Sequence, residues 1–197
     1  MDGGEPECPP PLSGPLRAFL RQELDDPSTS GDHATQQPHP FLLLVNDGPR
    51  LQLSRIKLRY FFSAEISGNW KADYFWASRV NGGPFDNSKG FSPGPTLKVK
   101  SAPAALPGAD HYLELGFNTD PALSLPTDKY VEVRAWFEVE QQQGQLVQSD
   151  DWSFVPTGTA SKTIDGGRYR ESQRVTVYVD DKLVWGAEPC ASAASKP

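Results

Sequence analysis

The sequence is dominated by short segments in which apolar and polar residues alternate. The longest lies at residues 129–139, where Val131, Val133, Ala135, Phe137 and Val139 occupy every second position. Successive side chains of a β-strand point to opposite faces, so this period of two indicates a strand with one face buried. Similar stripes occur at residues 111–117 and 175–179. The pattern predicts an all-β fold.

The connecting residues support the same fold class. The chain has 19 Pro and 17 Gly among 197 residues and lacks an uninterrupted amphipathic stretch long enough for a core helix. Nine or ten short strands separated by turn residues are typical of a β-sandwich or jelly roll. We expect one domain at residues 15–189, with disordered tails at residues 1–14 and 190–197.

Charge and targeting signals narrow the function classes. The net charge is −6 and the pI is about 5.1, so the chain lacks the basic surface that a nucleic acid partner selects. The sequence has no apolar run of the length that spans a membrane, and no signal peptide is visible at residues 1–6. We therefore expect neither a nucleic acid nor a membrane partner.

The two cysteines, Cys8 and Cys190, lie near opposite ends of the chain and have no metal-site spacing. If the termini lie side by side, the two form a disulfide. Free thiols on frayed tails are the alternative.

Acidic residues near two predicted strand ends suggest a metal site. Asp150 and Asp151 precede an alternating aromatic segment, and Glu65 follows the aromatic run at residues 60–62. Calcium prefers hard oxygen ligands, so two strand-end loops that bring these carboxylates together suit Ca²⁺. A solvated acidic turn is the simpler alternative.

Signals for catalysis are weak. Residues 90–94 match the G-x-S-x-G pattern of a nucleophile elbow, but Pro93 follows Ser92 and has no backbone N–H for an oxyanion hole. Glu132, Glu138 and Glu140 share one face of a strand, as solvent-facing charges also do. We expect a protein that is not an enzyme.

Several separate segments resemble the family 3 carbohydrate-binding modules in order and spacing. They include residues 41–48, 53–62, 112–115, 148–154 and 175–189, so the similarity runs from about residue 16 to 189. The resemblance implies a nine-stranded antiparallel β-sandwich with jelly-roll topology and a structural calcium ion. It also implies an extracellular, non-catalytic module that binds cellulose or a related β-glucan of plant type, beside a cellulase catalytic domain or in a scaffolding protein. The calcium ligands that it implies are Ser63, Glu65, Val147, Asp150 and Asp151, with Val147 acting through its carbonyl oxygen.

The family's cellulose-binding strip is altered in this sequence. Family members that bind crystalline cellulose use a flat strip of aromatic and polar side chains, because sugar rings stack on aromatic rings. The strip positions correspond here to Ser78, Arg79, Phe85, Trp136 and Gln143. Trp136 and Phe85 then form a different aromatic platform, or else Trp136 packs inside the sandwich and the strip is lost.

The family also has a shallow groove on the opposite sheet, at positions that correspond here to Arg59, Phe61, Tyr112, Glu114 and Trp152. Aromatic residues interleaved with charge suit a saccharide or a proline-rich linker peptide, although they are equally typical of ordinary cross-strand pairs. The sequence thus predicts a cellulose-binding module. The alternative is a module with a degenerate strip that holds linker peptides or partner proteins in its groove.

Overall fold

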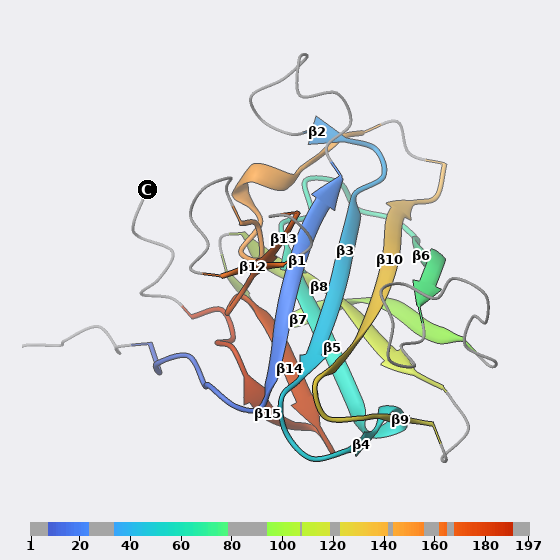
Figure 1. Cartoon of the computed structure of the whole chain (residues 1–197). Helices are drawn as coiled ribbons and strands as arrows, with labels where there is room; N and C mark the ends of the chain where they lie inside the picture. Colours follow the sequence, from blue (N-terminus) through green and yellow to red (C-terminus); the bar gives the residue numbers. More distant parts are fainter. Residues whose placement is uncertain are drawn as a thin grey trace, which may run out of the picture.

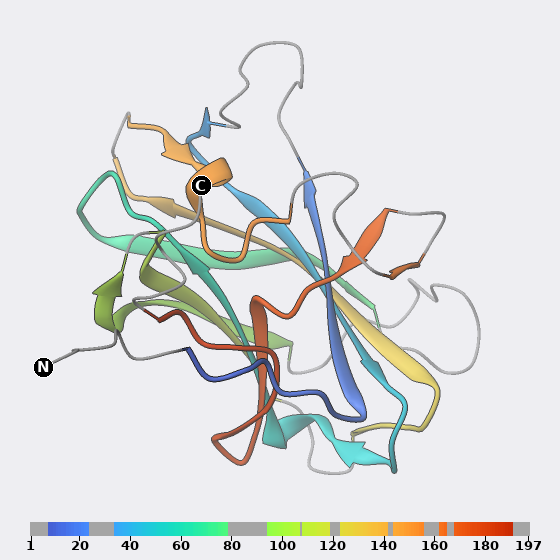
Figure 2. The same ribbon diagram turned by 90° about the vertical axis from the view of Figure 1, so that its left-hand side faces the viewer.

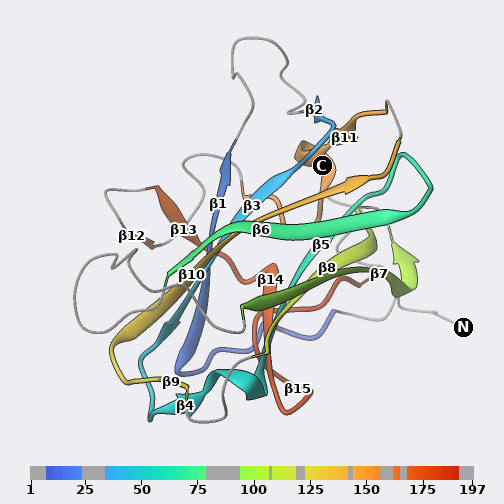
Figure 3. The same cartoon turned by 90° about the vertical axis from the view of Figure 1, so that its right-hand side faces the viewer.

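The computed structural model describes residues 8–23, 34–78, 94–106, 108–118, 123–141, 144–155, 162–164 and 168–190. Two antiparallel sheets pack face to face, as Figures 1 and 3 show. The six-stranded sheet has the order β12-β13-β1-β3-β10-β6, and the five-stranded sheet has the order β15-β14-β5-β8-β7. The all-β, antiparallel sandwich is confirmed, but the two main sheets contain six and five strands where nine in all were expected.

The strands of the six-stranded sheet are β12 (Thr163–Ile164), β13 (Tyr169–Glu171), β1 (Leu16–Glu23), β3 (His39–Asn46), β10 (Lys129–Val139) and β6 (Trp70–Ser78). Those of the five-stranded sheet are β15 (Lys182–Trp185), β14 (Val175–Val179), β5 (Ile56–Phe62), β8 (Ala109–Phe117) and β7 (Pro95–Leu106). Two short ladders pair β2 (Ala34–Thr35) with β11 (Leu146–Val147), and β4 (Leu51–Gln52) with β9 (Ser124–Leu125). Two 3₁₀ turns complete the described elements, η1 (Leu53–Arg55) and η2 (Gln148–Asp150).

The main core lies between the two sheets. Figure 2 shows the ribbon of these sheets from another side. The predicted stripe of β10 faces inward, because Val131, Val133, Ala135, Phe137 and Val139 are all buried. The ring of Phe137 lies 4.4 Å from the ring of Phe62 on the opposite sheet. The period of two therefore identified the inward face of this strand correctly.

A second apolar cluster covers part of the outer face of the six-stranded sheet. Phe19, Phe41, Leu43 and Tyr169 are buried there, with Ile164 packed against them. Tyr169 comes from β13, which pairs with β1 at the sheet edge. This explains why β3 is apolar on both faces: its outward side chains lie under residues of the β12–β13 hairpin.

The same hairpin buries a carboxylate. Glu132 on β10 is fully buried on the outer face, where Tyr169 donates a hydrogen bond from its hydroxyl and Arg134 donates from Nε at 2.9 Å. Both donors contact Oε1 of Glu132. Glu132, one of the acidic residues considered for catalysis, is therefore held in a hydrogen-bond network inside the fold.

The hairpin of β14 and β15 forms as predicted. Asp180 and Asp181 connect the two strands, and their φ values of 50° and 62° place both residues in the left-handed region. Two-residue hairpin loops favour this conformation because it matches the twist of the strands. Asp180 and Asp181 also pair with Arg55 and Lys57.

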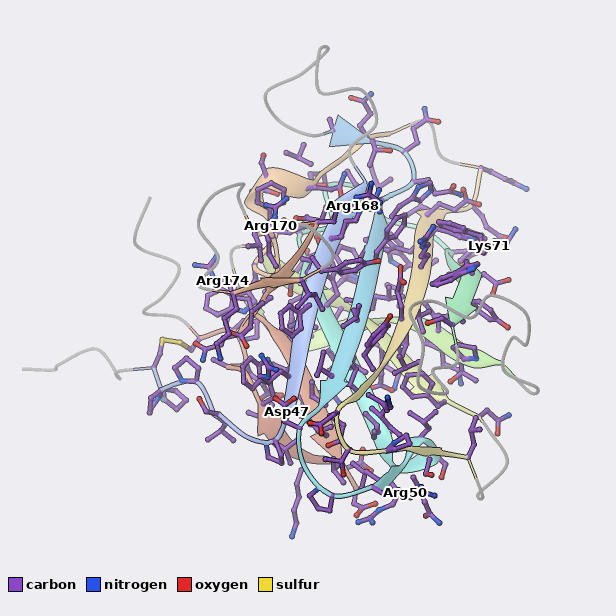
Figure 4. All side chains as sticks on the ribbon, viewed as in Figure 1. Asp47, Arg50, Lys71, Arg168, Arg170 and Arg174 are labelled. Atoms are coloured by element: carbon purple, nitrogen blue, oxygen red, sulfur yellow. A yellow bond between two sulfur atoms is a disulfide. The ribbon has the colours of Figure 1, made fainter. Side chains whose placement is uncertain are left out.

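The chain ends are held together. Cys8 and Cys190 form a disulfide with Cα atoms 5.9 Å apart, visible as the yellow bond in Figure 4. Leu12 and Gly186 exchange two backbone hydrogen bonds, of 2.9 and 3.0 Å. Residues 8–14, which the sequence analysis placed in a disordered tail, are joined to the C-terminal segment at two points, the Cys8–Cys190 disulfide and the Leu12–Gly186 backbone pair. Residues 1–7 and 191–197 lie outside the described part of the chain. Within that part, no helix is long and apolar enough to cross a membrane.

Candidate functional site

The two loops that were expected to share calcium ligands lie together at one end of the sandwich. The backbone N–H of Ser63 donates to Oδ1 of Asp151 at 3.0 Å. The N–H of Val147 donates to Oε2 of Glu65 at 3.2 Å. These bonds join residues more than 80 positions apart, so the structure brings the first loop beside the second.

Asp151 is the buried member of this group. Its side chain is almost fully enclosed, and Oδ2 accepts a hydrogen bond from the hydroxyl of Tyr60 at 2.7 Å. Burial raises the pKa of Asp151 well above its ordinary value, although the hydrogen bonds from Tyr60 and Ser63 lower it. Loss of hydration also raises the pKa values of Glu65 and Asp150, which lie at the surface. Among the described residues no lysine or arginine pairs with these three carboxylates.

A fourth acid, Asp110, was missed by the sequence reasoning. Its Oδ1 accepts the N–H of Ala64 at 2.8 Å, and its negative charge raises the pKa of Asp150. Asp110 is adjacent to this loop because His111 on β8 pairs with Phe62 on β5. That strand pairing is a long-range contact, so no local motif marks Asp110.

The donor set fits a hard cation in its chemistry. No group of three or more His, Cys, Asp or Glu side chains in the described segments is arranged to hold a metal ion. Glu65, Asp150 and Asp151 of the expected set are three such acids, so the described geometry does not gather them as a finished metal site. Carboxylate, hydroxyl and carbonyl oxygens are the types of ligand that calcium takes in proteins, so the chemistry of the expected residues suits calcium and the site stays a prediction.

The residues at the predicted strip positions do not share one environment. Trp136 lies on the outer face of β10, between the inward residues Ala135 and Phe137, and is half-buried there. The ammonium of Lys71, labelled in Figure 4, lies 5.6 Å from the centre of the Trp136 ring. Trp136 therefore does not pack between the two sheets.

Ser78 does not lie on the exposed strip. It is buried, and its Oγ accepts the N–H of Glu132 at 3.3 Å on the neighbouring strand. Its hydroxyl is thus used within the protein, and we leave it out of the candidate surface. Arg79, Phe85 and Gln143 lie outside the described residues, as do residues 90–93 of the G-x-S-x-G pattern.

The five groove positions gather on the outer face of the five-stranded sheet. Arg59 lies opposite Glu114 and Phe61 opposite Tyr112 in the β5–β8 pair. Trp152 packs against Phe61 and Tyr112. Phe61 and Tyr112 are buried and face each other as a cross-strand pair, so their rings are not open to a ligand. The cause is the cover that Trp152 and β7 place over them.

Arg59 is the centre of the groove. Its guanidinium lies 4.7 Å from the centre of the Tyr112 ring and 4.3 Å from that of Tyr178. Its Nε donates to Glu114 at 3.0 Å, and Lys100 donates to the other Glu114 oxygen at 2.7 Å. Burial raises the pKa of Glu114, but hydrogen bonds and charge from Lys100 and Arg59 outweigh burial and leave the pKa below its ordinary value.

Replacing Glu114 with glutamine is therefore expected to destabilise the fold in a pH-dependent way. A lowered pKa stabilises the folded state above the unfolded pKa, about 4.3, and this contribution is lost as pH falls through the folded value. At pH 7 we expect Glu114→Gln to lose about 1.5 kcal/mol of unfolding free energy, and less at about pH 3, which lies below the unfolded pKa. Urea unfolding at both pH values measures this. An equal loss at pH 3 and pH 7 would assign the effect to packing.

Comparisons with known proteins agree with this fold. A family model described as a cellulose binding domain matches residues 28–186. A xyloglucanase from Paenibacillus sp is 32% identical over 86% of this chain and 14% of its own length. A beta-mannanase/endoglucanase A from Caldicellulosiruptor saccharolyticus is 28% identical over 82% of this chain and 11% of its own length. The chain thus spans a small part of these relatives.

A solved structure matches over nearly the whole chain. The CBM3a-L domain with flanking linkers from scaffoldin cipA of the Clostridium thermocellum cellulosome has a TM-score of 0.72. It is 24% identical and covers 95% of this chain and 98% of that one, which shows a shared fold. The family model spans most of the chain, and the family consists of non-catalytic binding modules. The chain therefore belongs to the cellulose-binding domains of family 3, the family 3 carbohydrate-binding modules.

Proposed function

We propose that this module binds a β-glucan of plant type, with cellulose as the first candidate, through the outer face of the six-stranded sheet. The observation that carries the proposal is the position of Trp136, which lies on that face and not in the core. An aromatic ring at a strip position gives a sugar ring an apolar surface to stack on.

Polar side chains beside Trp136 suit the hydroxyl groups of a sugar. On the same face of β10, Glu138 accepts a hydrogen bond from Nε2 of Gln37 at 2.8 Å. The Oε1 of Gln37 in turn lies 3.0 Å from Nε2 of His39. Lys71 and Asp73 lie on the adjacent strand β6 and are exposed. This surface combines stacking with hydrogen bonding, which is the usual basis of sugar recognition.

A structural calcium ion is part of the proposal. Ser63, Glu65, Val147, Asp150 and Asp151 are the residues that would hold it. A bound divalent cation would supply the positive charge that the buried Asp151 carboxylate lacks among the described residues. The chain's own residues already join the two loops, through the Ser63–Asp151 and Val147–Glu65 hydrogen bonds.

The setting that we propose is extracellular, in a larger polysaccharide-degrading protein or assembly. A disulfide between Cys8 and Cys190 supports an oxidising compartment. The xyloglucanase and the beta-mannanase/endoglucanase are both much longer than the segment matched here, so a cellulase-type catalytic domain is the partner class that we propose.

The test is retention on insoluble microcrystalline cellulose and on soluble β-glucan, for wild type and Trp136→Ala. We expect Trp136→Ala to weaken binding about tenfold, the equivalent of 1.4 kcal/mol, because the sugar loses its stacking surface. Trp152→Ala is the matched control, since Trp152 is also half-buried but packs against the outer face of the opposite sheet. Wild-type protein that passes unretarded over both glucans would refute the proposed function.

The alternative function uses the groove to hold a linker peptide or partner protein. A cavity of about 120 Å³ beside Arg59 is lined by Ala102, Pro103 and Leu106, and also by the chain's own Glu188 and Pro189. A proline-containing segment thus already lies against this wall, which favours a peptide as occupant. A loss of retention in Trp152→Ala and not in Trp136→Ala would support the groove.

A further inference from the structure

A β-bulge interrupts β6 where it pairs with β10. Arg134 lies opposite Trp76 and Ala135 lies opposite Tyr74, so Phe75 has no partner in the β10 register. Phe75 continues the exposed series of Lys71 and Asp73, and the extra residue shifts the alternation after it, because Trp76 also faces outward, opposite Arg134. Here Phe75 is 51% exposed, and among the described residues Leu12 is the one other exposed large hydrophobic residue.

The ring of Phe75 extends across the neighbouring strand β10. Strands β6 and β3 flank β10 on opposite sides, so their backbones are about 10 Å apart. Yet the Phe75 ring lies 5.6 Å from the ring of Phe41 and 5.6 Å from the ring of His39, both on β3. The Phe75 side chain must therefore lie over the outer face of β10, the strand that carries Trp136.

The residues beneath Phe75 form a fixed support. Arg134 places its guanidinium 4.3 Å from the centre of the Trp76 ring and 5.2 Å from that of Phe41. Arg21 lies 5.1 Å from the centre of the Phe41 ring. Arginine groups thus cover faces of Trp76 and Phe41, whereas half of the Phe75 surface remains open to solvent. A ring held in place by its neighbours loses little conformational entropy when a ligand stacks on it.

We propose that Phe75 is a second sugar-stacking residue, which contacts the same β-linked glucan chain as Trp136. The proposal rests on the proposed function. Trp136 pairs with Asp73, two residues before Phe75 on β6, so the Cα atoms of the two aromatic residues are about 8 Å apart. The hydrogen-bonded series from Glu138 through Gln37 to His39 reaches the Phe75 ring from β10. A single glucan chain presents both ring faces and hydroxyl groups, which matches this combination.

The test compares Phe75→Ala, Phe75→Tyr and Leu12→Ala with wild type, on microcrystalline cellulose and on a soluble β-glucan. We expect Phe75→Ala to weaken binding about tenfold and Phe75→Tyr to bind like wild type, because the tyrosine keeps an aromatic ring. Leu12→Ala removes the other exposed large apolar side chain of the described residues, beside the C-terminal segment, and should bind like wild type. Weaker binding to cellulose alone would indicate that Phe75 contacts the surface of crystalline cellulose. Weaker binding to both glucans would indicate that Phe75 contacts a single glucan chain.

The same experiment distinguishes a failure of the Phe75 proposal from a failure of the proposed glucan-binding function. Unchanged binding by Phe75→Ala, together with weakened binding by Trp136→Ala, would overturn the role of Phe75 and leave the proposed function standing. If wild type binds neither glucan, both proposals are wrong. Thermal melting of each variant checks the fold, and the exposure of Phe75 predicts little change there.

Discussion

Removing calcium with a chelator is expected to lower the melting temperature by roughly 5–10 °C, reversibly on return of the ion. An ion that binds only the folded state at a hundred times its Kd stabilises it by about 2.7 kcal/mol. For a domain of this size, each kcal/mol shifts the melting temperature by about 2–4 °C. The physical reason is the buried Asp151 carboxylate, whose desolvation an ion offsets. Differential scanning calorimetry with chelator and with calcium measures the shift.

The variant Asp151→Asn makes this experiment specific. Asparagine keeps the shape of the side chain but removes the charge that burial disfavours. We expect the variant to melt in chelator at or above the wild-type temperature, and to show no rise when calcium is added. Asp128→Asn is the control, because Asp128 lies before β10 in a left-handed conformation that asparagine also adopts, and it should keep the calcium response. A wild-type melting curve that is identical in chelator and in calcium would remove the metal from the proposal.

Breaking the Cys8–Cys190 disulfide is expected to cost about 2–4 kcal/mol of unfolding free energy, a fall of roughly 5–15 °C in melting temperature. The bond joins residues 182 positions apart, so it restricts almost the whole unfolded chain. It also holds residues 8–14 beside the C-terminal segment, where Leu12 pairs with Gly186. Thermal melting with and without reductant measures the loss.

A variant with both cysteines changed to serine tests the origin of that loss. It should melt at the temperature of the reduced wild type and should not respond to reductant. The mass of alkylated wild-type protein confirms that the bond was reduced. If the fully reduced protein melts at the temperature of the oxidised protein, the disulfide contributes nothing to stability and the chain-entropy argument fails.

The metal-site prediction depended on residues near strand ends. Asp150 and Asp151 are adjacent in the sequence, and Glu65 follows an aromatic strand. In a β-sandwich, loops at strand ends can lie close together, so these residues were expected to be neighbours. Asp110 joins them only because β8 pairs with β5 in one register. Sequence alone gives no sign of that register, because several alternating strands have similar patterns.

The binding surface was harder to predict for a related reason. The alternation around Trp136 is a local property, and it correctly assigns this side chain to the face opposite Phe137. Whether an outward side chain meets solvent depends on what lies above it. Glu132 and Ser78 are outward on the same sheet but buried, whereas Phe75 is exposed like Lys71 and Asp73 before it on β6.

The sequence by itself determined the fold class, the inward face of each strong stripe and the family of the chain. The fold class and the inward faces depend on the two-residue period and on turn residues, which act over a few positions, and the family depends on the resemblance of several separate segments. The tertiary structure alone decided that β13 covers one part of the outer sheet, that Asp110 lies beside the acidic loops and that Cys8 meets Cys190. These contacts join segments far apart in the chain, and their geometry depends on strand order and register, which local patterns leave open.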